Sequence, residues 1–177
     1  MVWLAVGALA PALGHSEDTR LLSVGVRAGF TGDAPIGEQG GPYFRQYDAV
    51  AYLALPWESY SDSGWGIGTR FLISAGALDA ADDTGFISTF VPGISLGRKD
   101  GLISLEAGGG IALLSETKFG TQDFGGPFQF VWNLGARIAL YGPLGAGYWY
   151  QHISDATIYG SSSRGLDLHL VELSYRY

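Results

Sequence analysis

Residues 128–141 read FQFVWNLGARIALY, and their apolar and polar side chains alternate almost without interruption. The apolar positions are Phe128, Phe130, Trp132, Leu134, Ile138 and Leu140, and the polar ones are Gln129, Asn133 and Arg137. Side chains two residues apart lie on the same face of a β-strand, whereas a helix repeats every 3.6 residues. The stretch therefore predicts a strand with one apolar and one polar face.

The same alternation recurs along the chain, for about ten residues at a time. Further strands are predicted at about 21–30, 46–57, 65–77, 86–97, 102–114, 144–157 and 166–177. With 128–141 the total is eight, and no long segment has a convincing helical period. The sequence therefore predicts an all-β protein.

Alternating strands fit either a soluble sandwich or a membrane barrel, and two features favour the barrel. The polar faces carry both cations and anions, which can pair inside a closed lumen: Arg27, Asp48, Arg70, Glu106, Arg137, Glu172 and Arg176. A ten-residue strand rises ~33 Å and, tilted by ~45°, covers about 24 Å, close to the ~25 Å apolar band of outer-membrane barrels. We predict an eight-stranded antiparallel transmembrane up-and-down β-barrel, filled by its own side chains and so not a pore. Within the lumen we expect Glu172 to pair with Arg176.

The connections between the predicted strands fall into two sets. One set, at about 31–45, 79–84, 116–127 and 158–165, contains the longest, and the other lies at about 58–64, 98–101 and 142–143. Outer-membrane barrels have long extracellular loops and short periplasmic turns. We therefore expect a multi-pass barrel in the outer membrane of a Gram-negative bacterium, with both termini periplasmic. Segment 58–64 is long for a periplasmic turn.

Composition and the N-terminus narrow the class further. The chain has no cysteine, which excludes a disulfide framework and a thiolate metal site. It has 10 basic residues in no run and a net charge of −7, so a nucleic-acid partner is not expected. Residues 2–14 are apolar and uncharged but too short to span a bilayer, and they suit the core of a signal peptide whose positive n-region is missing. We expect residues 1–14 to be a signal peptide, truncated or misassigned at its start, and residues 15–177 to form one barrel domain.

Three polar residues interrupt the apolar face near the C-terminus. Alternation places His152 and Ser154 on the lipid-facing side of segment 144–157, and Asp167 on the same side of the next strand. Serine, histidine and a carboxylate are the parts of an activated nucleophile, in which histidine takes the serine proton and the carboxylate orients the imidazole. A site that opens onto the bilayer favours a lipid ester as substrate. Residues that simply meet headgroups and water are the alternative, and this is our interpretation of the nearby His169.

The segment HISDATIYGSSSRGLDLHLVELSYRY, residues 152–177, resembles the C-terminal end of the lipid A 3-O-deacylase (PagL) family. The family motif is His-x-Ser-Asn-Ala, then a short loop ending in glycine, then an acidic residue two positions later. His152, Ser154 and Ala156 match it, Gly165 is the loop glycine and Asp167 takes the acidic position. The resemblance implies an eight-stranded outer-membrane barrel whose Ser-His-acid triad removes the 3-O-linked acyl chain from lipid A of lipopolysaccharide in the outer leaflet. It implies neither a metal nor an organic cofactor.

The segment departs from the family pattern in several places. Asp155 replaces an asparagine associated with oxyanion stabilisation, and an anion there would repel the tetrahedral intermediate unless it were protonated or turned away. Thr157 replaces a small residue, commonly glycine, and Asp167 is one methylene shorter than the usual glutamate.

These departures leave other functions open. The alternative is a non-catalytic barrel, either a structural or adhesive surface protein or a family member whose site has decayed. An acyltransferase on the same scaffold is a third hypothesis, disfavoured because its lumen would have to hold an acyl chain. The sequence is also compatible with a homodimer.

Overall fold

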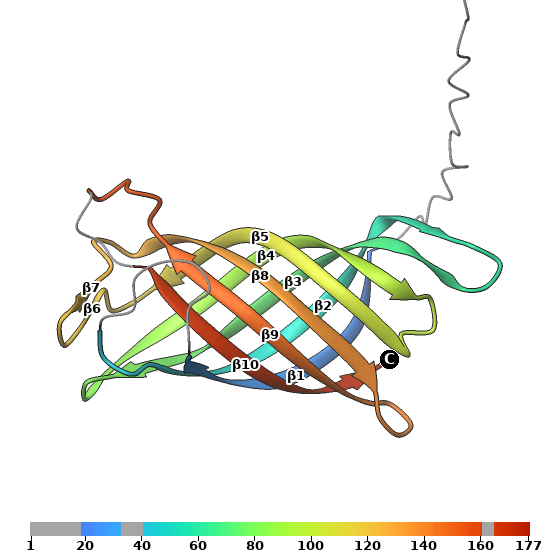
Figure 1. Cartoon of the computed structure of the whole chain (residues 1–177), viewed down its shortest axis with the longest axis horizontal. Coiled ribbons are helices and arrows are strands. Elements are labelled where there is room, and N and C mark those ends of the chain that lie inside the picture. Colours follow the sequence, from blue (N-terminus) through green and yellow to red (C-terminus); the bar gives the residue numbers. More distant parts are fainter. Residues whose placement is uncertain (1–18, 33–40, 161–164) are drawn as a thin grey trace, which may run out of the picture.

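A computed structural model describes residues 19–32, 41–160 and 165–177, which form a closed antiparallel barrel of eight long strands (Figure 1). The strands are β1 (Arg20–Thr31), β2 (Arg45–Tyr60), β3 (Trp65–Ala80), β4 (Asp83–Arg98), β5 (Ile103–Leu114), β8 (Phe128–Ala139), β9 (Leu144–Ser154) and β10 (Leu166–Arg176). Their order around the barrel is β1-β10-β9-β8-β5-β4-β3-β2. The all-β class and the eight-stranded architecture are thus confirmed. The proposed signal peptide, residues 1–14, lies outside the described residues.

Several strand ends differ from the prediction. Strand β2 continues to Tyr60, so the connection to β3 is the tight turn 61–64 and not the long segment 58–64. Strands β3 and β4 meet across Ala81 and Asp82, whose φ angles of 52° and 67° form a two-residue hairpin turn. Strand β9 ends at Ser154, three residues earlier than predicted. A small hairpin, β6 (Lys118–Phe119) and β7 (Gln122–Asp123), lies in the connection between β5 and β8.

The barrel has two distinct ends. At the turn end, short turns 61–64, 99–102 and 140–143 join the strands, and the C-terminus lies there (Figure 1). At the loop end, β9 stops at Ser154 and β10 begins at Leu166, beside the β6–β7 hairpin. Strands β1, β5 and β8–β10 have 11 or 12 residues. This corresponds to about 25–28 Å along the barrel axis at a tilt of roughly 45°. Among the described residues, no helix is long and apolar enough to cross a membrane.

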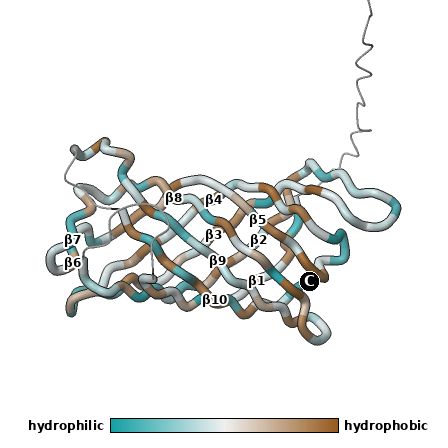
Figure 2. The backbone as a smooth tube through the Cα atoms, viewed as in Figure 1, coloured by the Kyte–Doolittle hydropathy of each residue, from teal (hydrophilic) through white to brown (hydrophobic). Residues whose placement is uncertain are grey.

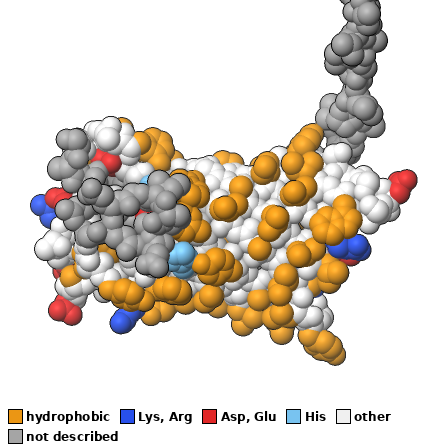
Figure 3. All heavy atoms as spheres, in the orientation of Figure 1, with side chains coloured by type: hydrophobic (Ala, Val, Ile, Leu, Met, Phe, Trp, Pro, Cys, Tyr) orange, Lys and Arg blue, Asp and Glu red, His pale blue; other side chains and the backbone are white. Residues whose placement is uncertain are grey.

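The two faces of the wall follow the alternation in the sequence. Hydrophobic and hydrophilic residues alternate along the strands (Figure 2), and large apolar side chains cover the outer wall while charged ones gather towards its two ends (Figure 3). In β8, for example, Phe130 and Leu134 are exposed, whereas Gln129 and Asn133 between and beside them are buried in the lumen. The outer wall is therefore the apolar one, which is the reverse of a soluble protein and suits a bilayer.

The middle of the lumen is polar and paired. Arg27 donates from Nε to Asp48 Oδ1 at 3.2 Å and from Nη2 to Asp48 Oδ2 at 2.5 Å. Glu172 accepts hydrogen bonds from the Tyr52 hydroxyl and from Trp149 Nε1, and its Oε1 lies 3.3 Å from Arg137 Nε. The predicted pair between Glu172 and Arg176 is wrong, because Glu172 pairs with Arg137 and Arg176 donates to backbone carbonyls at the turn end.

Apolar side chains close the lumen at the loop end. The rings of Phe44, Phe119 and Phe124 pack edge to face, with centroids 5.4–6.0 Å apart. Ile153 near the end of β9 and Leu168 near the start of β10 are fully buried in the lumen and belong to the same apolar core as these rings. These buried side chains hold the backbone of β9 and β10 in place. His152, Ser154 and Asp167 lie on the opposite, outer face of the same strands.

Candidate active site

The register of β9 and β10 brings His152 and Asp167 together. The two residues are directly opposite each other in the ladder, and both side chains point out of the barrel because the residues that flank them are buried inside. His152 Nδ1 lies 2.8 Å from Asp167 Oδ1, and the two side chains are 18% and 11% exposed. A carboxylate at this position holds the imidazole with Nδ1 towards it, which leaves Nε2 to exchange a proton.

Tyr150 is a third member of this cluster, and sequence reasoning missed it. Its hydroxyl donates a hydrogen bond to Asp167 Oδ1, the same oxygen that faces His152. Tyr150 precedes His152 by two residues and so shares its face of β9, while its direct partner in β10 is His169. The shared face was readable in the sequence, but the diagonal reach to Asp167 depends on the register between the strands.

Ser154 is the last residue of β9 and is half-buried on the same outer face as His152. Its direct partner in β8 is Phe130, and the partner of His152 there is Trp132, whose ring centroid is 5.7 Å from the imidazole. In the part of the chain that the structure describes, no hydrogen bond joins the Ser154 hydroxyl to His152. Without substrate, catalytic hydrogen bonds are often long and tighten only in the complex.

Gly165 lies against the imidazole edge that Asp167 does not hold. A Cβ built on this glycine would be 2.9 Å from His152 Cε1 and 3.4 Å from Nε2. Any side chain at this position would therefore push on the ring. Sterics therefore explain why glycine occupies position 165. Without a side chain, the backbone can pass close to the His152 ring as it enters β10.

The turn after Ser154 contains two of the departures from the motif. Asp155 is 5% exposed, and its two carboxylate oxygens accept hydrogen bonds from the N–H groups of Thr157 and Tyr159 at 3.0 and 3.2 Å. The carboxylate is therefore turned into the chain that follows it. Ala156 and Thr157 have φ angles of 48° and 69°, a left-handed conformation that glycine adopts without strain and a β-branched residue does not.

Tyr159 anchors this turn to the neighbouring loop. Its side chain packs closely on Gly125 and Gly126, where an added Cβ on Gly126 would come within 2.3 Å of Tyr159 Cζ. Contact between the two connections fixes the height of the Ser154 turn above the barrel wall.

His169, the second histidine on this face, shares Tyr150 with the Asp167 cluster, since the two rings pack edge to face with centroids 5.5 Å apart. The Tyr148 hydroxyl lies 2.5 Å from its Nδ1, and the Phe30 ring stacks on it at 6.0 Å. It belongs to an aromatic cluster beside Asp167, formed with Phe30, Tyr148 and Tyr150. The interpretation of His169 as an interface residue stays a prediction.

The structure is a closed eight-stranded barrel with an apolar outer wall. An Asp–His pair and a serine lie on that wall, so the protein is a membrane-type barrel with a candidate hydrolase site. Residues 45–176 match the family described as lipid A 3-O-deacylase (PagL), and the chain belongs to that family. A solved structure described as the outer membrane enzyme PagL has the same fold, with a TM-score of 0.69 at 18% identity, over 86% of this chain and 98% of that one. No curated protein is similar enough in sequence to count as a match.

Proposed function

We propose that this protein is an outer-membrane serine esterase that removes the 3-O-linked acyl chain from lipid A of lipopolysaccharide. Family membership supplies the reaction class, and one observation carries the assignment to this surface. That observation is the 2.8 Å contact between His152 Nδ1 and Asp167 Oδ1 on the outer wall of the barrel. His152, the proposed general base, lies on the apolar outer face of the barrel, where a substrate held in a membrane leaflet can reach it.

The proposed orientation places the loop end outside the cell. The strands that carry the cluster have 11 residues, enough to cross the apolar band once at the tilt of a barrel strand. His152 and Asp167 lie near the loop end of these strands, and Ser154 is at the very end of β9. Their level is then the outer leaflet, where lipopolysaccharide presents its ester-linked chains.

In the proposed mechanism, Ser154 Oγ attacks the acyl carbonyl while His152 Nε2 takes the hydroxyl proton. The tetrahedral intermediate collapses, and His152 returns the proton to the departing sugar oxygen. Water then hydrolyses the acyl-serine by the same route, so the site returns to its starting state. Asp167 orients the imidazole and stabilises its charged form, and Tyr150 is proposed as a positioning residue that holds Asp167.

The turn after the nucleophile contains a candidate donor for the oxyanion. The N–H groups of Thr157, Ile158, Tyr159 and Gly160 all donate within the turn itself. The N–H of Ala156 has no such partner among the described residues, and we propose it as the donor to the developing negative charge. Both carboxylate oxygens of Asp155 accept from N–H groups of the turn, so its charge need not oppose the reaction. No metal or organic cofactor enters these steps.

Mass spectrometry of lipid A tests the proposal directly. The refolded barrel in detergent should remove one hydroxyacyl chain, and Ser154→Ala should remove none. Ser88→Ala is the matched control, because Ser88 is also half-buried, alternates with the buried Ile87 and Thr89, and lies on β4, away from β9 in the barrel order. It should behave as wild type.

The competing function is a barrel without catalysis, and the same measurement separates the two. If the wild-type barrel is folded and leaves lipid A unchanged, the deacylase proposal is rejected and a structural or adhesive role is favoured. If Ser154→Ala retains the activity, the reaction stands but the nucleophile is wrong.

A further inference from the structure

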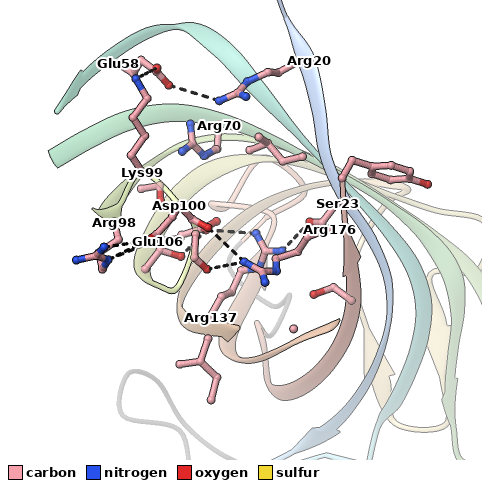
Figure 4. Close-up of a pocket in the computed structure, with 18 of the residues that line it drawn as sticks. Arg20, Ser23, Glu58, Arg70, Arg98, Lys99, Asp100, Glu106, Arg137 and Arg176 are labelled. Carbon is pink, nitrogen blue, oxygen red and sulfur yellow. Dashed lines mark hydrogen bonds and ion pairs between the residues drawn. The ribbon is translucent and has the colours of Figure 1, made fainter. Parts of the chain in front are cut away.

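At the turn end, the lumen opens into a cavity of about 150 Å³ (Figure 4). Its wall carries six cationic side chains and three acidic ones. This excess is unusual in a chain with a net charge of −7. Water alone would fill the space, since a cavity needs only about 10–15 Å³ of such volume for each molecule. The charge of the wall, however, favours an anion.

Each acid of the wall already has a cation as partner. The pairs are Glu58 with Arg20 and Lys99 at 4.0 and 3.6 Å, Asp100 with Arg98 at 2.8 Å, and Glu106 with Arg137 at 3.5 Å. Arg137 also faces Glu172, which lies beneath the cavity. Even with Glu172 counted, the cationic side chains outnumber the acidic side chains by two.

The two cations left over are Arg70 and Arg176, which form no ion pair in the described part of the chain. Arg70 donates only to the Thr69 carbonyl and the Tyr60 hydroxyl, at 3.0 and 3.1 Å. Arg176 donates to the backbone carbonyls of residues 100, 101 and 142, and its Nε is buried without a partner. Neutral acceptors satisfy hydrogen bonds but leave both positive charges uncompensated.

We propose that this cavity binds a phosphate-class oxyanion. Arg70, Arg137 and Arg176 come from β3, β8 and β10, strands spread around the closed barrel, and Figure 4 shows them around the same opening. A tetrahedral anion offers oxygens in several directions, which suits donors on different sides better than the flat edge of a carboxylate does. Arginine is also the side chain whose fork matches phosphate oxygens.

The anion site is separate from the proposed esterase site. It lies inside the barrel at the turn end, whereas His152, Ser154 and Asp167 lie on the outer wall near the loop end. It does not depend on deacylase activity. Two sources of the same chemistry reach this end of the barrel, namely free inorganic phosphate and the phosphodiester headgroup of a lipid.

The test is a titration of the full refolded barrel in a phosphate-free detergent, followed through the Nε–H NMR signals of its arginines. Inorganic phosphate should shift the signals of Arg70 and Arg176 and saturate. Arg70→Gln should weaken the apparent affinity about tenfold, the loss expected for one charge-assisted hydrogen bond. Arg45→Gln is the matched control, because Arg45 begins β2 at the other end of the barrel, above the Tyr43 ring.

Two further titrations distinguish free phosphate from a lipid headgroup and exclude a nonspecific effect of anions. Phosphatidylglycerol in mixed micelles, in place of free phosphate, tests the headgroup, and saturation by either probe supports the site. Acetate at equal ionic strength should give a much weaker response. The proposal is overturned if neither phosphate probe saturates, if acetate matches phosphate, or if Arg70→Gln responds like Arg45→Gln. Arg176→Gln should weaken phosphate binding in the same way, and if it fails to fold, Arg70→Gln decides alone, since Arg70 donates only to two local acceptors.

Discussion

Asp48 and Asp167 are two largely buried carboxylates, the first on the inner face of the barrel and the second on its outer face. Asp48 is fully buried in the lumen and clamps Arg27 through both oxygens. Asp167 lies on the outer face, partly exposed, and accepts from Tyr150 beside His152. The difference lies in the partner. A guanidinium is always charged and cannot give up its proton, whereas an imidazole can gain or lose one. The inner pair therefore holds the barrel together, and the outer pair has a proton to exchange.

The sharpest test of this comparison is Asp167→Asn. The amide keeps the shape but does not stabilise the imidazolium or select the correct tautomer, so deacylation should fall about 10³–10⁴-fold. The free energy of unfolding should hardly change, because the site lies on the surface of the wall. Rate measurement by mass spectrometry and urea unfolding in lipid vesicles check both parts. Wild-type activity in this variant would contradict the proposed triad.

Asp48→Asn should have the opposite profile. It leaves the Arg27 guanidinium buried without its counter-charge, and removal of one partner from a buried pair destabilises by about 3–5 kcal/mol. Urea unfolding should report this loss, while the activity per folded barrel stays near wild type. If Asp48→Asn and Asp167→Asn reduced activity alike, the proposed distinction between a structural Asp48–Arg27 pair and a catalytic Asp167–His152 pair would fail.

Gly165→Ala should disturb the reacting pair without touching its atoms. The added Cβ would press on the edge of the His152 ring, and a displacement of this kind can reduce the rate by about 10–100-fold. Gly109→Ala is the control, because Gly109 is exposed on β5 and its added Cβ would meet only a carbonyl oxygen 3.9 Å away. Equal rates in the two variants would show that the ring tolerates the contact.

Tyr150→Phe removes a hydrogen bond that acts on Asp167 and not on the substrate. We expect kcat to fall about three- to tenfold, since one hydrogen bond to a charged group is lost at one remove from the reaction. KM should stay unchanged. Tyr148→Phe, which loses the contact with His169 on the same face, should leave both constants as in wild type. A larger effect at Tyr148 would move the proposed site towards His169.

The smallest expected effect is at Thr157. Its φ of 69° strains a β-branched residue, so Thr157→Gly should stabilise the protein, by up to about 1 kcal/mol after the entropy of glycine is subtracted. The same change at Thr69, within strand β3, should destabilise. Differential unfolding in urea compares the two, and destabilisation at position 157 would show that the turn relies on the threonine side chain.

The barrel could be predicted from the sequence because its pattern is two-residue alternation, which runs along most of every long strand and is interrupted by register shifts near Leu21–Ser23 in β1 and Ala54–Glu58 in β2. The same rule put His152, Ser154 and Asp167 on one face before any contact was known. Lumen partners were not predictable in this way. Glu172 binds Tyr52 and Arg137, from strands distant in sequence, and only the closed order of strands brings them together.

Local geometry marks the second limit. Asp155 reads in sequence as a charge in the wrong place, because composition cannot show that its oxygens serve the N–H groups of Thr157 and Tyr159. The positive φ at position 157 shows why glycine suits this position, and the sequence alone does not show that φ. In both cases the decisive fact is the path of the backbone over a few residues, which alternation does not encode.

The position of His152 and Ser154 on the outer wall also determines how the enzyme would meet its substrate. A lipid reaches such a site by lateral diffusion within the leaflet, so the encounter takes place in two dimensions. The rate then follows the number of substrate molecules per unit of surface and not their number per unit of solution volume. Addition of an inert amphiphile at constant total lipid A should slow turnover by surface dilution alone, although every catalytic group remains in place.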